Sequence, residues 1–122
     1  MGINQSFKKY IDEVFSMVMM GEMSDGDGRS KKTPKKNYGL GGELKGKYMM
    51  SVTANDHEEA FNNPDEAFFN GMSEDDLFKP MHLNFKWFGF DPLPTFMAYD
   101  IMKNPEIESD SERFENHLEN NF

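Results

Sequence analysis

Apolar side chains recur every three or four positions in the first part of the chain, which is the spacing of one helix face. The apolar stripe consists of Phe7, Tyr10, Ile11, Val14, Phe15 and Val18. Asn4 or Ser6 can cap the start of such a helix, and Gly21 lies where it should end. The pattern therefore predicts a helix within residues 1–20.

Two short apolar runs have the length of strands rather than of helices. The first, "KYMMSVT", predicts a strand over residues 47–53. The second, "LPTFMAYDIM", predicts a strand over residues 93–102. Pro92 and Pro94 suit the entrance or edge of this strand, because proline has no amide hydrogen to donate to a neighbouring strand.

Helical patterns fill residues 65–89 between these strands, beginning with a short helical stretch near 65–70. Ser73 and Asp76 then have the spacing of a capping box. Apolar residues follow at helical intervals, namely Leu77, Phe78, Met81, Phe85 and Phe88. Pro80 should kink this helix and Gly89 should end it.

The last helix is predicted over residues 109–122. Ser109 with Glu112 three residues later can start it, and Phe114, Leu118 and Phe122 then share one face. Residues 21–46 form a long loop rich in Gly, Asp, Lys and Pro. Strands separated by helices predict an α/β fold with a parallel sheet. Two strands alone fall short of the several that such a sheet needs.

Composition narrows the class of protein. With 122 residues, the chain is predicted to form one domain. It has no cysteine, which excludes disulfides and thiolate metal sites, and no apolar run long enough to span a membrane. A cytoplasmic protein without a membrane partner is therefore expected.

The charge of the chain is unevenly distributed. Residues 1–47 hold nine basic against six acidic side chains, whereas 48–122 hold four against sixteen. The basic run over 29–36 is either a solvated loop or a means of attracting a phosphate-bearing cofactor. The acidic remainder would repel a nucleic acid backbone, so no nucleic acid partner is expected.

Four segments, taken in order, resemble the modulator of drug activity B proteins. They are "KKYIDEVF" (8–15), "YGLGGELKGKYMMSVTAN" (38–55), "EEAF" (58–61) and "GFDPLPTFMAYDIMKNPEI" (89–107). That family comprises flavodoxin-like NAD(P)H:quinone reductases that bind FAD. The resemblance implies a single partial flavodoxin-like domain over 1–122. This domain would have its helices packed on strands four and five, and no counterpart of strands one to three or of the phosphate-binding loop.

The resemblance also implies an activity and a site. Hydride would pass from NAD(P)H through FAD to a quinone, in a homodimer or higher oligomer whose flavin sites lie at subunit interfaces. The positions that match the flavin site are Tyr38, Thr53, Ala54, Asn55, Asp56 and Met1. After the Thr the family usually has an aromatic residue and then Asn-Ala-Pro. The carboxylate of Asp56 is thus an addition, and near a reduced flavin it would lower the redox potential.

Other hypotheses remain beside this one. The chain could be a flavin-free remnant that acts as an oligomeric structural or interaction protein. It could also be a half-protein that completes its sheet with a separately encoded partner. Natural shortening, a misassigned start and a fragment of a longer chain are alternative origins for the missing strands.

The remaining candidate residues carry weaker signals. His57, His82 and His117 are too scattered for a metal site, so no metal is expected. His57 is a candidate proton donor to a quinone, or else an exposed loop residue. His82 is predicted to pack within its helix and His117 to face solvent. Trp87 is predicted to be a core or dimer contact, and no catalytic residue is assigned.

Overall fold

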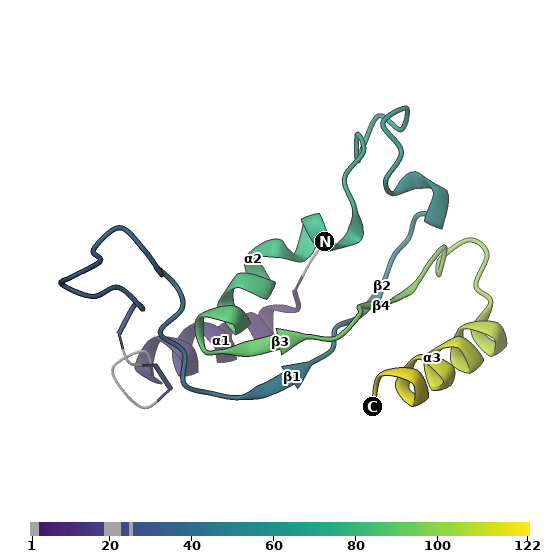
Figure 1. Ribbon diagram of the computed structural model, residues 1–122. Helices are drawn as coiled ribbons and strands as arrows, with labels where there is room; N and C mark the ends of the chain where they lie inside the picture. Colours follow the sequence, from purple (N-terminus) through teal and green to yellow (C-terminus); the bar gives the residue numbers. More distant parts are fainter. Residues whose placement is uncertain (1–2, 19–22, 25) are drawn as a thin grey trace. The chain divides into compact units, whose positions relative to one another are not determined.

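The computed structural model describes residues 3–18, 23–24 and 26–122 (Figure 1). Its elements in chain order are α1 (Gln5–Val18), β1 (Gly46–Tyr48), β2 (Ser51–Thr53), the 3-10 helix η1 (Glu58–Ala60), α2 (Glu74–Trp87), β3 (Phe90–Pro92), β4 (Phe96–Ala98) and α3 (Ile107–Asn121). They belong to two compact units. The first contains 1–47 and 78–91, and the second contains 48–77 and 92–122.

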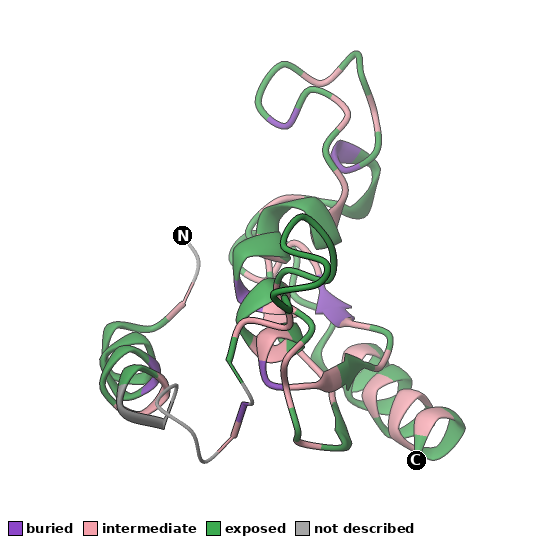
Figure 2. Cartoon of the chain, turned by 60° about the vertical axis from the view of Figure 1, so that its left-hand side comes forward, coloured by how far each residue is buried: buried purple, intermediate pink, exposed green. Residues whose placement is uncertain are grey.

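The second unit is built on the parallel pairing of β2 with β4 (Figure 1). Ser51 is opposite Phe96, and Thr53 is opposite Ala98. The ladder continues at both ends, since the Phe96 N–H donates to Met50 O at 2.9 Å and the Ala54 N–H donates to Ala98 O at 2.8 Å. All three residues of β4 are buried (Figure 2). The prediction that the two apolar runs lie side by side in the same direction is confirmed.

Both strands are shorter than predicted. The run over 47–53 is divided between β1 and β2, and β1 pairs with a further short strand, β3. The run over 93–102 retains only β4 as regular strand. Pro94, just before β4, has no N–H with which to extend the ladder. A backbone contact just after β3 takes over, in which the Leu93 N–H donates to the O atom of Tyr48 in β1 at 2.7 Å.

Helix α2 begins with the capping box that its sequence predicts. The Asp76 N–H donates to Ser73 Oγ at 3.1 Å, and the Ser73 N–H donates to Asp76 Oδ2 at 2.9 Å. The helix continues through Pro80 to Trp87. Gly89 follows with φ +97°, a conformation that glycine adopts without the strain of a side chain. A Cβ at this position would lie 2.3 Å from Leu44 O.

The prediction of a helix near 65–70 is wrong. That segment is a series of turns in which the Asp65 N–H donates to Asn63 Oδ1 at 3.0 Å and the Gly71 N–H donates to Asn63 O at 3.1 Å. Asn side chains satisfy nearby backbone groups in this way and so compete with helix formation. The turns bring Phe69 against Phe61, with ring centroids 4.4 Å apart. These two rings and Ala60 form the apolar core of the second unit.

The outer helices differ from the predictions in detail. Helix α3 begins at Ile107 rather than near Ser109, and its Phe114 ring meets Phe96 edge-on at 5.0 Å. Phe122 was predicted to share that apolar face, but it is 79% exposed. In α1, Ile11 is buried and Phe15 contacts the Phe88 ring at 4.7 Å.

Replacement of the cap residue tests the start of α2. We expect Ser73→Ala to lower the free energy of unfolding by about 1 kcal/mol, because the Asp76 N–H loses its acceptor. Urea denaturation measures this change. The matched control is Ser109→Ala, since Ser109 is exposed within α3 and caps nothing there. Equal destabilisation by the two substitutions would contradict the assigned cap.

Candidate functional site

The carboxyl end of β2 is held rigidly against the segment that follows β4. Ala54 donates its N–H to Ala98 O at 2.8 Å and accepts the Ile101 N–H at 3.2 Å. Two residues later, Asp56 O accepts the Asp100 N–H at 2.9 Å. The backbone beyond the strand therefore keeps a defined path and presents a fixed surface, as preorganised binding sites require.

The side chains along this path alternate in their surroundings, as they do along a strand. Ala54 packs against the core of the second unit, whereas Thr53 and Asn55 are exposed. The Asn55 amide forms no hydrogen bond to any residue that the structure describes. A flat ring lying across the exposed face of this end would thus meet a hydroxyl group and an amide with both donors and acceptor available.

Asp56 and His57 form an exposed ion pair beside these residues. The Asp56 Oδ1 atom lies 2.7 Å from His57 Nδ1 and also accepts the His57 N–H at 2.9 Å. The backbone and side-chain hydrogen bonds from His57 lower the pKa of Asp56. The bond to the carboxylate raises the pKa of His57 above its usual value, and the Glu59 and Glu66 charges add to this. The additional carboxylate is therefore compensated by a positive charge when His57 is protonated.

A polar depression of about 370 Å³ lies near β4 in the same unit. There the Tyr99 hydroxyl donates to Glu74 Oε1 at 2.5 Å, and burial together with this bond raises the pKa of Tyr99. His117 was predicted to face solvent, but its Nε2 lies 2.7 Å from Pro94 O and its ring meets Phe96. Sequence reasoning missed these contacts because they join residues more than twenty positions apart.

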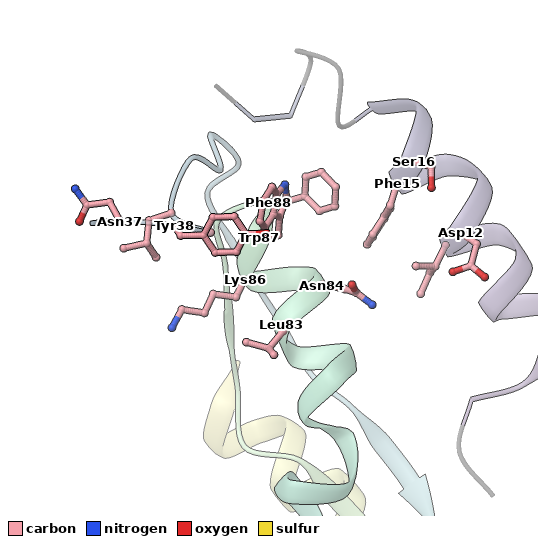
Figure 3. A pocket seen from close by; sticks show the side chains of 13 residues that line it. Asp12, Phe15, Ser16, Asn37, Tyr38, Leu83, Asn84, Lys86, Trp87 and Phe88 are labelled. Carbon is pink, nitrogen blue, oxygen red and sulfur yellow. The ribbon is translucent and has the colours of Figure 1, made fainter. Parts of the chain in front are cut away.

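Tyr38 lies in the first unit, on the wall of an open pocket of about 620 Å³ (Figure 3). Tyr38 is 67% exposed, and its ring meets the Trp87 ring edge-on, with centroids 5.4 Å apart. The Arg29 guanidinium lies over the Tyr38 ring, 5.4 Å from its centroid, and is itself held by Asp27. Aromatic residues of three segments therefore converge on one cavity.

The structure brings together only part of the predicted site. Thr53, Ala54, Asn55 and Asp56 are contiguous in the second unit, Tyr38 belongs to the first unit, and Met1 lies outside the described residues. Trp87 was predicted to be a core or dimer contact, but it lines the pocket. Its indole Nε1 is shielded from solvent and has no hydrogen-bond partner among the described residues. Such an atom carries a penalty of about 1–3 kcal/mol.

The residues that the structure describes contain neither a candidate metal cluster nor a membrane-spanning helix. No three His, Asp or Glu side chains in this part of the chain come together in a group that could hold a metal ion. No described helix is both long and apolar enough to cross a membrane.

Comparison with known proteins links the chain to flavodoxin-like proteins. A family model described as flavodoxin-like fold matches residues 1–121. The chain is 39% identical to the NADPH:quinone oxidoreductase MdaB of Haemophilus influenzae over 116 residues, which cover 94% of the chain and 59% of that protein. It is 38% identical to an uncharacterised protein of Schizosaccharomyces pombe over 123 residues, covering 100% of the chain and 62% of that protein. The chain thus spans about three fifths of the length of these relatives, and the resemblance to the modulator of drug activity B proteins is confirmed.

The Asp56–His57 pair predicts a measurable histidine titration. Asp56→Asn keeps an acceptor for the His57 N–H but removes the charge, so the pKa of His57 should fall towards its ordinary value near 6.5. NMR titration of the histidine rings measures the shift, and His82 and His117 serve as internal controls. An unchanged His57 pKa would contradict the ion pair.

The same pair predicts how stability depends on pH. A raised histidine pKa contributes stability that is fully present below about pH 6.5 and is lost as the pH rises through the folded-state pKa. The lowered pKa of Asp56 contributes stability at pH values above 3.8, the ordinary pKa of this group. That stability is lost as the pH falls through the folded-state pKa of Asp56. The difference in stability between the natural chain and Asp56→Asn should therefore be largest between these limits. Denaturant titrations at pH 5.5 and 8.5 compare the two conditions.

Proposed function

The chain belongs to the family of flavodoxin-like proteins, and we propose that it is a flavin-dependent NAD(P)H:quinone oxidoreductase. The name of the Haemophilus influenzae relative supports this activity. In this proposal FAD is the cofactor, NAD(P)H is the electron donor and a quinone is the acceptor. The protein works in the cytoplasm as a homodimer.

The observation that carries the proposal is the parallel pairing of β2 with β4, which ends at Thr53, directly before residues 54–56. In open α/β sheets, ligands bind beyond the carboxyl ends of parallel strands. Thr53, Ala54 and Asn55 occupy such an end, and their backbone is held in place by hydrogen bonds to the segment after β4. These residues fit a planar ring, because the Thr53 hydroxyl is exposed and the Asn55 amide is available to a ring carbonyl.

Each residue has a separate task in this proposal. The flavin, when bound, accepts hydride from the nicotinamide and passes two electrons to the quinone. Asn55 orients the ring edge by donating a hydrogen bond, and Thr53 offers its exposed hydroxyl group on the same side. Asp56 fixes the orientation of the His57 ring through Nδ1. His57 would thereby hold a proton at an exposed position beside the residues that would hold the flavin.

A spectrum of the purified chain tests the proposal. After incubation with FAD and removal of the excess, we expect folded protein to retain the visible flavin absorption. Colourless but folded protein would contradict the proposal and support the alternative, a flavin-free oligomeric protein with a structural or interaction role.

Variants then locate the cofactor. Asn55→Ala should weaken FAD binding about fivefold, which corresponds to the loss of one hydrogen bond of roughly 1 kcal/mol. Asn120→Ala is the matched control, because Asn120 is an exposed amide residue on α3. Equilibrium dialysis measures both affinities. Equal affinity of the two variants would place the flavin away from Asn55.

A further inference from the structure

Charge is divided unequally between the two compact units of the chain. The first unit holds eleven basic and seven acidic side chains, whereas the second holds two basic and fifteen acidic side chains. The first unit is therefore positive and the second strongly negative. Surfaces of opposite sign attract each other over a distance, so such a division can steer one copy of the chain towards another.

The loop at 29–36 contains much of the positive charge of the first unit. Arg29 already has an acidic partner, because its side chain donates to Asp27 Oδ2 at 2.8 Å. The other basic residues of the loop are all exposed, and none forms a salt bridge to a residue that the structure describes. They are Lys31, Lys32, Lys35 and Lys36. These four charges are available to a partner.

Two successive turns give this lysine loop a defined backbone. The Thr33 N–H donates to Ser30 O at 3.1 Å, and the Lys36 N–H donates to Thr33 O at 3.2 Å. Pro34 occupies the second position of the later turn, where its ring fixes φ. A loop ordered in this way loses less conformational freedom on binding than an unstructured basic tail would lose.

The outer side of α3 carries the complementary charge. Four exposed glutamates follow one another at intervals of four, three and four residues, so they form a single stripe about 16 Å long. They are Glu108, Glu112, Glu115 and Glu119. None of them forms a salt bridge within the described part of the chain. Arg113, the one Lys or Arg of α3, is bonded to Asp110 and to Met97 O instead.

This glutamate stripe works against the helix that carries it. Like charges three or four residues apart on a helix repel each other. Glu119 also lies in the last turn, where the helix dipole favours a positive charge and where α3 has no basic residue. The contact of α3 with β4 is made by Phe114 against Phe96 rather than by the glutamates. A feature that opposes local stability without serving the core is expected at a functional surface.

We propose that the chain associates with a second copy of itself through the lysine loop of one copy and the glutamate stripe of the other. In a two-fold dimer both contacts form at once, because each copy supplies one loop and one stripe. The proposed function includes a homodimer, and this inference rests on that part of it by naming the surfaces in contact. It does not depend on a bound flavin.

Reversal of the charges tests the contact in the full chain. The loop variant carries Lys31→Glu, Lys32→Glu, Lys35→Glu and Lys36→Glu, and the helix variant carries Glu108→Lys, Glu112→Lys, Glu115→Lys and Glu119→Lys. Each variant alone brings like charges together, so sedimentation velocity should show self-association about tenfold weaker than that of the natural chain. An equimolar mixture of the two variants restores opposite charges at both contacts. We expect this mixture to associate as strongly as the natural chain.

A matched control separates the contact from the effect of net charge. It carries Lys45→Glu, Lys47→Glu, Lys79→Glu and Lys86→Glu, which are exposed positions of the first unit outside the loop. Its net charge equals that of the loop variant, but both proposed surfaces stay intact. Circular dichroism checks that every variant is folded. Equal weakening by the control and the loop variant would overturn the proposal, as would a mixture of folded variants that does not associate.

Carbodiimide cross-linking locates the contact without any substitution. The reagent joins a lysine Nζ to a glutamate carboxyl carbon as an amide and takes up the water that is lost. In a mixture of ¹⁵N-labelled and unlabelled chains, mass spectrometry should find peptides of the loop joined to peptides of α3 that carry the other isotope. Raising the ionic strength from about 0.01 M to about 1 M should remove these products, because the screening length falls from about 30 Å to about 3 Å. Links confined to single chains would overturn the proposal.

The two proposals fail in different ways. A chain that associates through these surfaces but retains no FAD would refute the proposed flavin chemistry alone. A chain that retains FAD, but whose association is unaffected by charge reversal, would refute this contact alone.

Discussion

The second unit depends on the parallel ladder between β2 and β4. Only three residues of each strand take part, yet β4 is buried along its whole length and the ladder is extended by bonds from Phe96 and Ala54. A buried backbone needs its hydrogen bonds satisfied, so the ladder sets the register of both strands. That register in turn decides which residues point outwards beyond β2, with Ala54 on the core and Thr53 and Asn55 exposed.

The carboxylate of Asp56, which departs from the family pattern, has a different effect once its contact with His57 is known. From the sequence, a carboxylate at position 56 predicts repulsion of a reduced ring. In the structure the carboxylate accepts two hydrogen bonds from His57, one of them from the imidazole. The pair is neutral when His57 is protonated and negative when it is not. A ring bound beside it would therefore experience an environment that depends on pH near neutrality.

Local signals in the sequence predicted the elements that depend on local interactions. The capping box at Ser73 and the glycine after α2 act within a few residues, and both were predicted correctly. The parallel direction of the strands followed from the order of strands and helices. The turns near 65–70 were missed because Asn63 competes with the helix through its own side chain.

Long-range contacts could not be predicted in the same way. Whether His117 faces Pro94 or solvent depends on how α3 packs beside β4, which helical spacing alone does not determine. Likewise, Trp87, Tyr38 and Phe15 come from three separated segments, and nothing in their spacing indicates a shared pocket. The family resemblance indicated Tyr38 and residues 53–56, but it contained no signal for the pocket wall formed by α1 and α2.

The proposed function depends on a flavin ring that lies across the end of β2. The most direct test is an amide NMR spectrum of the isotope-labelled chain recorded during titration with FAD. The account predicts that the largest shifts fall on residues 53–57 and on residues 98–101, which are hydrogen-bonded to them. Shifts confined to other parts of the chain, or no shifts at all, would contradict it.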